Sequence, residues 1–147
     1  MIIETRVFGA VEIDDAKLVR FVGPMLGFEG AERYALMDPN PEGPFKALQL
    51  VDDPDRCFLV ADPSLFFPDY HVQLDAAQVS DLGLDDPAEA AVLVVVTARD
   101  GGARLTANLL GPLVVNAQTF RGKQVVLTGT SYKVDEPLPV QVTLQHG

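Results

Sequence analysis

The chain has 147 residues, a length that fits one globular domain with its own hydrophobic core. Its hydrophobic content of 48% is close to that of ordinary globular proteins and argues against a disordered chain, which would have too little apolar surface to bury. With 21 acidic and 11 basic residues, the net charge is −10 at pH 7, which makes direct binding of nucleic acid or of an anionic membrane surface unfavourable.

Short apolar runs separated by turn residues follow one another along the chain and predict β-strands. Most runs are rich in Val, Leu and Phe, and they have the length of strands rather than of helices. Four Asp-Pro pairs and an Asp-Gly-Gly sequence at 100–102 predict turns between them. The predicted strands span residues 5–13, 34–37, 45–51, 57–61, 71–74, 91–98, 113–116, 123–128 and 140–144.

Helical signals are few. Residues 74–82 predict one short helix, with Asp75 as its N-cap and Gly83 as its end, and residues 87–89 predict one further turn. The chain is therefore expected to form a single all-β domain over residues 1–147, mainly antiparallel, as a small closed or nearly closed barrel or a sandwich. The tail from residue 135, which contains two prolines, is expected to pack as an edge segment.

The residues do not form a recognisable catalytic, cofactor or metal motif. The chain has two histidines, His71 and His146, but no Gly-x-Ser-x-Gly elbow that would supply a nucleophilic serine. A zinc site usually has three or four His or Cys ligands, and the whole chain offers one cysteine and two histidines. The glycines do not match a phosphate-binding loop. We therefore predict no enzyme, cofactor or metal, while carboxylate chemistry of the kind used in glycoside hydrolysis stays open as an alternative.

The same features bear on the cellular compartment. Cys57 is the single cysteine and lies in an apolar run, which indicates a buried structural thiol and gives no sign of an oxidising environment. The first residues do not have the pattern of a signal peptide, and the most apolar stretch, 90–98, is too short to span a bilayer as a helix. We expect a cytoplasmic protein.

Several segments along the chain match, in order, the pattern of one known family: Gly-Ala-Val-Glu-Ile at 9–13, Phe21 with Gly-Phe-Glu at 27–29, Phe-Lys-Ala-Leu-Gln at 45–49, residues 58–63, Phe-Pro-Asp-Tyr at 67–70, residues 106–116, and residues 122–127 with Tyr132. Together they resemble the FliW family of flagellar assembly factors. No single motif is specific, but the set covers residues 2 to 134 in the expected order. The chain departs from the family pattern at His71, where an acid is common, and at Asp135, where a basic residue is expected.

The resemblance implies a protein that binds other proteins. Members of the family bind the carbon storage regulator CsrA, a small basic RNA-binding dimer, and relieve its repression of flagellin translation. They also bind flagellin, so that cytoplasmic flagellin sequesters the factor and frees the regulator. The net charge of −10 fits a basic partner independently, although solubility alone would also explain it. A free monomer and no direct contact with nucleic acid are expected.

Candidate partner-binding residues follow from the resemblance and from loop chemistry. Asp69, Tyr70 and His71 form the first candidate patch, since exposed polar loop residues often neighbour binding hot spots. Asn108 is the second, although a structural amide that bonds loop backbone is the alternative for it. Asp52 and Asp53 could meet basic partner residues or form only a solvated turn. Besides regulation through CsrA, the alternative functions are a flagellin chaperone that acts without CsrA and a carboxylate-based enzyme or ligand-binding barrel.

Overall fold

The computed structural model describes residues 1–23 and 33–139. The loop containing Gly27 and the strand predicted at 140–144 lie outside these ranges. The described strands are β1 (Ile2–Thr5), β2 (Gly9–Glu12), β3 (Val19–Phe21), β4 (Arg33–Met37), β5 (Phe45–Leu50), β6 (Cys57–Ala61), β7 (Ala90–Arg99), β8 (Arg104–Ala107), β9 (Leu113–Asn116), β10 (Arg121–Gln124) and β11 (Glu136–Pro137).

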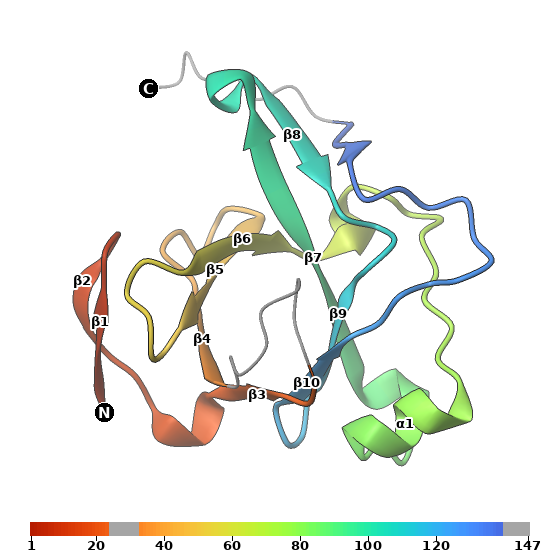
Figure 1. Ribbon diagram of the computed structural model, residues 1–147, viewed down its shortest axis with the longest axis horizontal. Helices are drawn as coiled ribbons and strands as arrows, with labels where there is room; N and C mark the ends of the chain where they lie inside the picture. The colour runs from red at the N-terminus through yellow and green to blue at the C-terminus, as the bar shows by residue number, and fades with distance from the viewer. Residues whose placement is uncertain (24–32, 140–147) are drawn as a thin grey trace.

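Seven of these strands close into a ring. The order is β7-β6-β5-β4-β3-β10-β9, and β9 pairs back onto β7 (Figure 1). Neighbours in the ring are antiparallel, except that β3 and β10 run parallel. The all-β fold that the sequence predicts is confirmed, with strands arranged nearly as a barrel.

The length of β7 makes the closure possible. Its first half, from Ala90 to Leu93, pairs with β9, and its second half, from Val96 to Arg99, pairs with β8. The chain leaves the sheet at 108–112 between β8 and β9, so one long strand serves both the ring and an arm that projects from it (Figure 1). β11 adds to the outer edge of β8, which confirms the edge position expected for the start of the tail.

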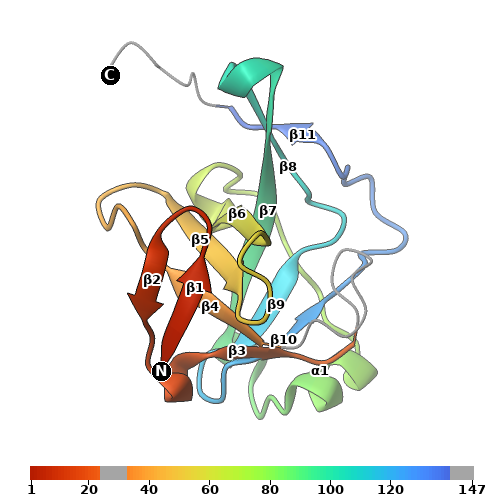
Figure 2. The same ribbon diagram turned by 60° about the vertical axis from the view of Figure 1, so that its left-hand side comes forward.

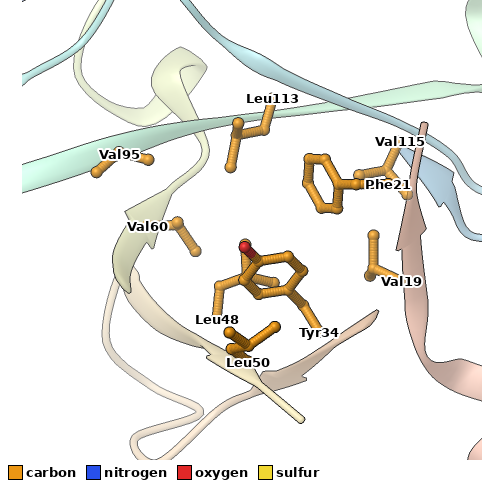
Figure 3. Close-up of a cluster of buried hydrophobic side chains, with 9 residues drawn as sticks. All are labelled: Val19, Phe21, Tyr34, Leu48, Leu50, Val60, Val95, Leu113 and Val115. Carbon is orange, nitrogen blue, oxygen red and sulfur yellow. The ribbon is translucent and has the colours of Figure 1, made fainter. Parts of the chain in front are cut away.

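Apolar side chains fill the inside of the ring. Val19 and Phe21 point inward from β3, and the ring of Tyr34 lies among them, with its hydroxyl directed into the middle of the cluster (Figure 3). Phe21 and Tyr34 meet edge to face at 5.2 Å between centroids. Each such side chain contributes about 1.5–3 kcal/mol on burial. A Cβ at Gly122 would lie 3.1 Å from Cγ1 of Val19, so any larger residue there would require the side chains of β3 to shift.

The hairpin β1–β2 forms a separate sheet and packs against the outside of the ring (Figure 2). One continuous strand was predicted over 5–13, and that prediction is wrong because the chain turns at residues 6–8. The hydroxyl of Thr5 accepts from the N–H of Phe8 and donates to the carbonyl of Gly9, which has φ +71°. Ile3 on β1 is buried against the ring.

The single α-helix of the described residues, α1 (Ala76–Leu82), packs against β10. Asp75 caps it by accepting from the N–H of Gln78, and the side chain of Gln78 accepts from the N–H of Asp75. Gly83 ends it in the left-handed region at φ 65°, as the sequence predicts. The predicted turn at 87–89 is also present, as a 3-10 helix.

Two further strand predictions fail for a common reason, which is that the backbone bonds to loops rather than to strands. Residues 71–74 pair with none of the described strands, and the N–H of His71 donates to the hydroxyl of Tyr132. β10 begins at 121 and ends at 124 instead of spanning 123–128. From there, Val125 and Leu127 donate their N–H groups to carbonyls of the 108–112 loop. The predictions also missed β3 and β8, which are short.

Candidate partner-binding surface

Three loops that are distant in the sequence meet around Tyr70. Its hydroxyl donates to the carbonyl of Leu109 at 2.6 Å, and its ring meets that of Tyr132 edge to face at 4.7 Å between centroids. The carbonyl of Lys133 accepts from the N–H groups of Leu109 and Leu110. Loop 62–75 is thereby fixed to the 108–112 loop and to residues 128–134, which gives this surface a defined shape.

Burial raises the pKa of the Tyr70 hydroxyl above its ordinary value, and the neighbouring Tyr132 raises it further. At neutral pH the group is therefore protonated and acts as a donor. Tyr70 is half-buried, whereas Asp69 and His71 on either side are exposed. The tyrosine acts as an anchor and presents its two polar neighbours to solvent. We call Asp69, Tyr70, His71 and Tyr132 the Tyr70 surface.

A hollow of about 470 Å³ adjoins the Tyr70 surface. It lies between the segment that leads into α1 and the segment 126–132, and both His71 and Tyr132 line it. Sequence reasoning missed this hollow because it assigned both segments to strands. Large exposed apolar side chains lie on the segments that meet here: Leu65, Val126 and Val134. Exposed apolar groups beside polar ones are typical of surfaces that bind proteins.

Asn108 belongs to the same region but has a structural contact. Its side-chain oxygen accepts from the N–H of Gly111 at 2.9 Å and so closes the loop between β8 and β9. The next residue, Leu109, supplies the carbonyl that Tyr70 binds. The structure therefore places Asn108 beside the Tyr70 surface, with its amide oxygen engaged inside the loop.

Asp52 and Asp53 lie elsewhere, in the turn between β5 and β6. Asp52 pairs with Arg33 at 3.1 Å, and Asp53 pairs with Arg56 at 3.0 Å. This turn precedes β6 and loop 62–75 follows it, so the two candidate regions are separated by the length of the strand, about 16 Å (Figure 1). The structure does not bring them into one patch.

A further hollow, of about 610 Å³, has a mainly apolar lining. Among the described residues that line it, Asp62 is the one acid, and its carboxylate accepts from the N–H and the hydroxyl of Ser64. A pair of acids, which carboxylate chemistry would need, is not found among these lining residues. Within residues 1–23 and 33–139, no cluster of three or more His, Cys, Asp or Glu could hold a metal ion.

Comparison with known proteins gives consistent matches. The family model described as FliW protein matches residues 2–138. "Flagellar assembly factor FliW" of Moorella thermoacetica is 42% identical over 134 residues, which cover 90% of this chain and 84% of that protein. The protein of the same name from Treponema denticola is 38% identical over 127 residues, 86% of each chain.

The similarity extends to three dimensions. A structure described as "Crystal structure of the flagellar assembly factor FliW" superposes with a TM-score of 0.87 and 34% sequence identity, and the alignment covers 97% of this chain and 100% of that one. In the part of the chain that the structure describes, no helix has the length and apolar character needed to cross a membrane.

Proposed function

The chain belongs to the FliW family of flagellar assembly factors, and from this membership we propose that it acts by binding proteins and couples the level of flagellin to flagellin translation. In this proposal it antagonises a CsrA-type translational regulator in the cytoplasm, and accumulating flagellin competes for it. It works as a monomer when free, without catalysis and without contacting nucleic acid. The observation that carries the proposal is the family match over residues 2–138, nearly the whole chain.

Electrostatics supports a basic partner. The net charge of −10 would steer a basic dimer toward this protein, and an acidic body beside RNA would repel the phosphate backbone. Because both effects are screened by salt, association should slow as ionic strength rises.

The Tyr70 surface is the region we propose for contact, with Asp69 and His71 as exposed neighbours of the anchoring Tyr70. Asp52 and Asp53 are a second, separate candidate. Each of these two acids already has a basic partner on this chain, which offsets part of its charge. Asp69 forms no ion pair among the described residues and is exposed, which favours the Tyr70 surface.

Titration with the host's CsrA-type regulator and with its flagellin, each at low and high salt, tests the proposal. We expect saturable binding of both proteins, mutual competition, and weaker regulator binding at high salt. Binding of flagellin without any binding of the regulator would replace the proposal with a chaperone function. Failure to bind either protein would refute both functions.

Two charge reversals localise the contact. Asp69→Lys at the Tyr70 surface should lower the association rate of a basic partner by roughly tenfold, because a charge at an interface acts mainly on steering. Glu4→Lys provides the matched control. This substitution makes the same change in net charge, and Glu4 is exposed on the outer hairpin. Equal effects of the two reversals would show that only total charge matters and would remove the Tyr70 surface from the proposal.

A further inference from the structure

Three arginines form a row across the outside of the ring. Arg121 on β10 lies opposite Arg20 on β3, and Arg20 lies opposite Arg33 on β4. The neighbours of Arg20 in the chain, Val19 and Phe21, are buried inside the ring, so Arg20 points outward. Residues directly opposite one another share a face, with Cβ atoms about 5 Å apart. The row joins residues that lie up to a hundred positions apart in the sequence.

Two of these arginines have no counter-charge among the described residues. Arg33 pairs with Asp52 at 3.1 Å, but Arg20 and Arg121 are exposed and form no ion pair within residues 1–23 and 33–139. Like charges placed directly opposite are destabilising. Acids outnumber bases on this chain by 21 to 11, and most basic side chains of the described residues have acidic partners. Lys17, Arg99 and Lys133 also form no ion pair there, but Arg20 and Arg121 are the unpaired bases that lie directly opposite each other. An unpaired arginine pair on such a surface points to an anion that comes from elsewhere.

The arginine pair borders a hollow of about 390 Å³ between β3, β10 and the end of α1. The residues described as lining it are Arg20, Val22, Leu82, Gly83, Thr119 and Arg121, and none of them is an acid. The oxygen of Thr119 accepts from the N–H of Arg121, which leaves the hydroxyl proton of Thr119 available for donation.

The carbonyl oxygens at the end of α1 are engaged by a donor and so repel an anion in this hollow less than free carbonyls would. The oxygens of Leu82 and Gly83 accept from the side-chain amide of Asn116, at 3.0 and 3.3 Å, so this donor offsets their partial negative charge. The backbone here is fixed by other bonds as well, since the N–H of Arg20 donates to the carbonyl of Phe120. The hollow is thus a pre-formed site with donors on two of its sides.

The described residues that line the hollow carry positive charge although the whole chain is acidic. The charged pairs next to the site, Arg33 with Asp52 and Lys123 with Asp81, are each neutral as a pair. Among the described residues that line the hollow, Arg20 and Arg121 contribute two positive charges and no acid is present, and charges more than about 8 Å away are largely screened at physiological ionic strength. A small anion at this hollow responds to the arginine pair more than to the net charge of −10.

We propose that this hollow binds a phosphate group, held by the guanidinium groups of Arg20 and Arg121 and by the hydroxyl of Thr119. A guanidinium presents its N–H groups as a planar fork that matches two oxygens of an oxyanion. A phosphate monoester carries a charge of about −1.5 to −2 at pH 7, which balances two arginines, whereas a single carboxylate balances one. The site is separate from the Tyr70 surface and does not depend on the function proposed above.

Titration of the whole chain with inorganic phosphate tests the site, by backbone amide NMR and by thermal unfolding against sodium chloride of equal ionic strength. We expect saturable shifts of amide signals near residues 20, 119 and 121. O-phospho-L-serine, titrated in the same way, distinguishes a free anion from a phosphate carried on a larger molecule, and binding of either one supports the site. Acetate should bind at least tenfold more weakly.

The double variant Arg20→Gln/Arg121→Gln should weaken phosphate binding at least tenfold. Because both side chains are exposed and repel each other, the variant is expected to fold with unchanged or higher stability. The matched control is Arg6→Gln/Arg99→Gln, which removes the same charge from exposed positions away from the hollow and should change binding less than twofold. Equal binding by the two variants, shifts that do not saturate, or acetate binding as strong as phosphate binding would overturn the proposal.

Discussion

Replacing Tyr70 by phenylalanine removes one oxygen atom and tests whether this residue anchors its surface. The hydroxyl donates at 2.6 Å to the carbonyl of Leu109, a residue with 3% of its surface exposed. Water has little access to that carbonyl, so its lost hydrogen bond is not readily replaced. Leaving a buried acceptor in this state costs about 1–3 kcal/mol.

The expected effect is large enough to measure. A loss of about 2 kcal/mol corresponds to a decrease in Tm of roughly 4–8 °C for a domain of this length. The chain contains no tryptophan, so urea unfolding is best followed by far-ultraviolet circular dichroism. The m-value should not change, because the surface exposed on unfolding stays the same.

Tyr132→Phe is the matched control. The hydroxyl of Tyr132 accepts from the N–H of His71, which is exposed and can bond to water instead. We expect a loss of about 0.5 kcal/mol for this variant. The anchoring role of Tyr70 would be refuted if Tyr70→Phe were as stable as the original chain, or if Tyr132→Phe were the more costly change.

Three further results are expected, all measurable by urea unfolding. Tyr34→Phe should leave stability unchanged or raise it by about 1 kcal/mol, because the buried hydroxyl of Tyr34 has no hydrogen-bond partner within residues 1–23 and 33–139; a clear loss would contradict this. Gly122→Ala should cost about 1–3 kcal/mol, since the added methyl group would press on Val19 and Phe21. Burial raises the folded pKa of Tyr70 above its ordinary value of 10.0, so the folded state holds this proton more tightly. The free energy of unfolding that this proton contributes is fully present below about pH 10 and is lost as pH rises through the folded pKa. Between pH 9 and 11, Tyr70→Phe should therefore lose less stability than the original chain.

Local chemistry in the sequence was sufficient where a few neighbouring residues fix the backbone. Asp75 and Gly83 bound α1 as predicted, because an N-cap acceptor and a left-handed C-terminal residue act within one turn of helix. The apolar runs at 45–51 and 57–61 correspond to β5 and β6 to within a residue. Such runs can be identified because a strand buried in a sheet must be apolar whichever strand it pairs with.

The tertiary structure determined what depends on contacts between distant residues. The run at 71–74 has the composition of a strand, yet none of the described strands pairs with it, and the hydroxyl of Tyr132 accepts from the N–H of His71. The position of Tyr70 among three loops has the same origin, since its partner Leu109 lies 39 residues away. Neither contact leaves a periodic signal in the sequence.

The composition determined the overall acidity. Segments that follow one another in the same order as in the family indicated the family that the comparisons establish. The row formed by Arg121, Arg20 and Arg33 is different, because the parallel pairing of β10 with β3 sets its register. A one-residue slip in either ladder would turn one of these arginines toward the inside of the ring. The sequence thus fixes how much charge the chain carries, and only the folded sheet fixes which charges become neighbours.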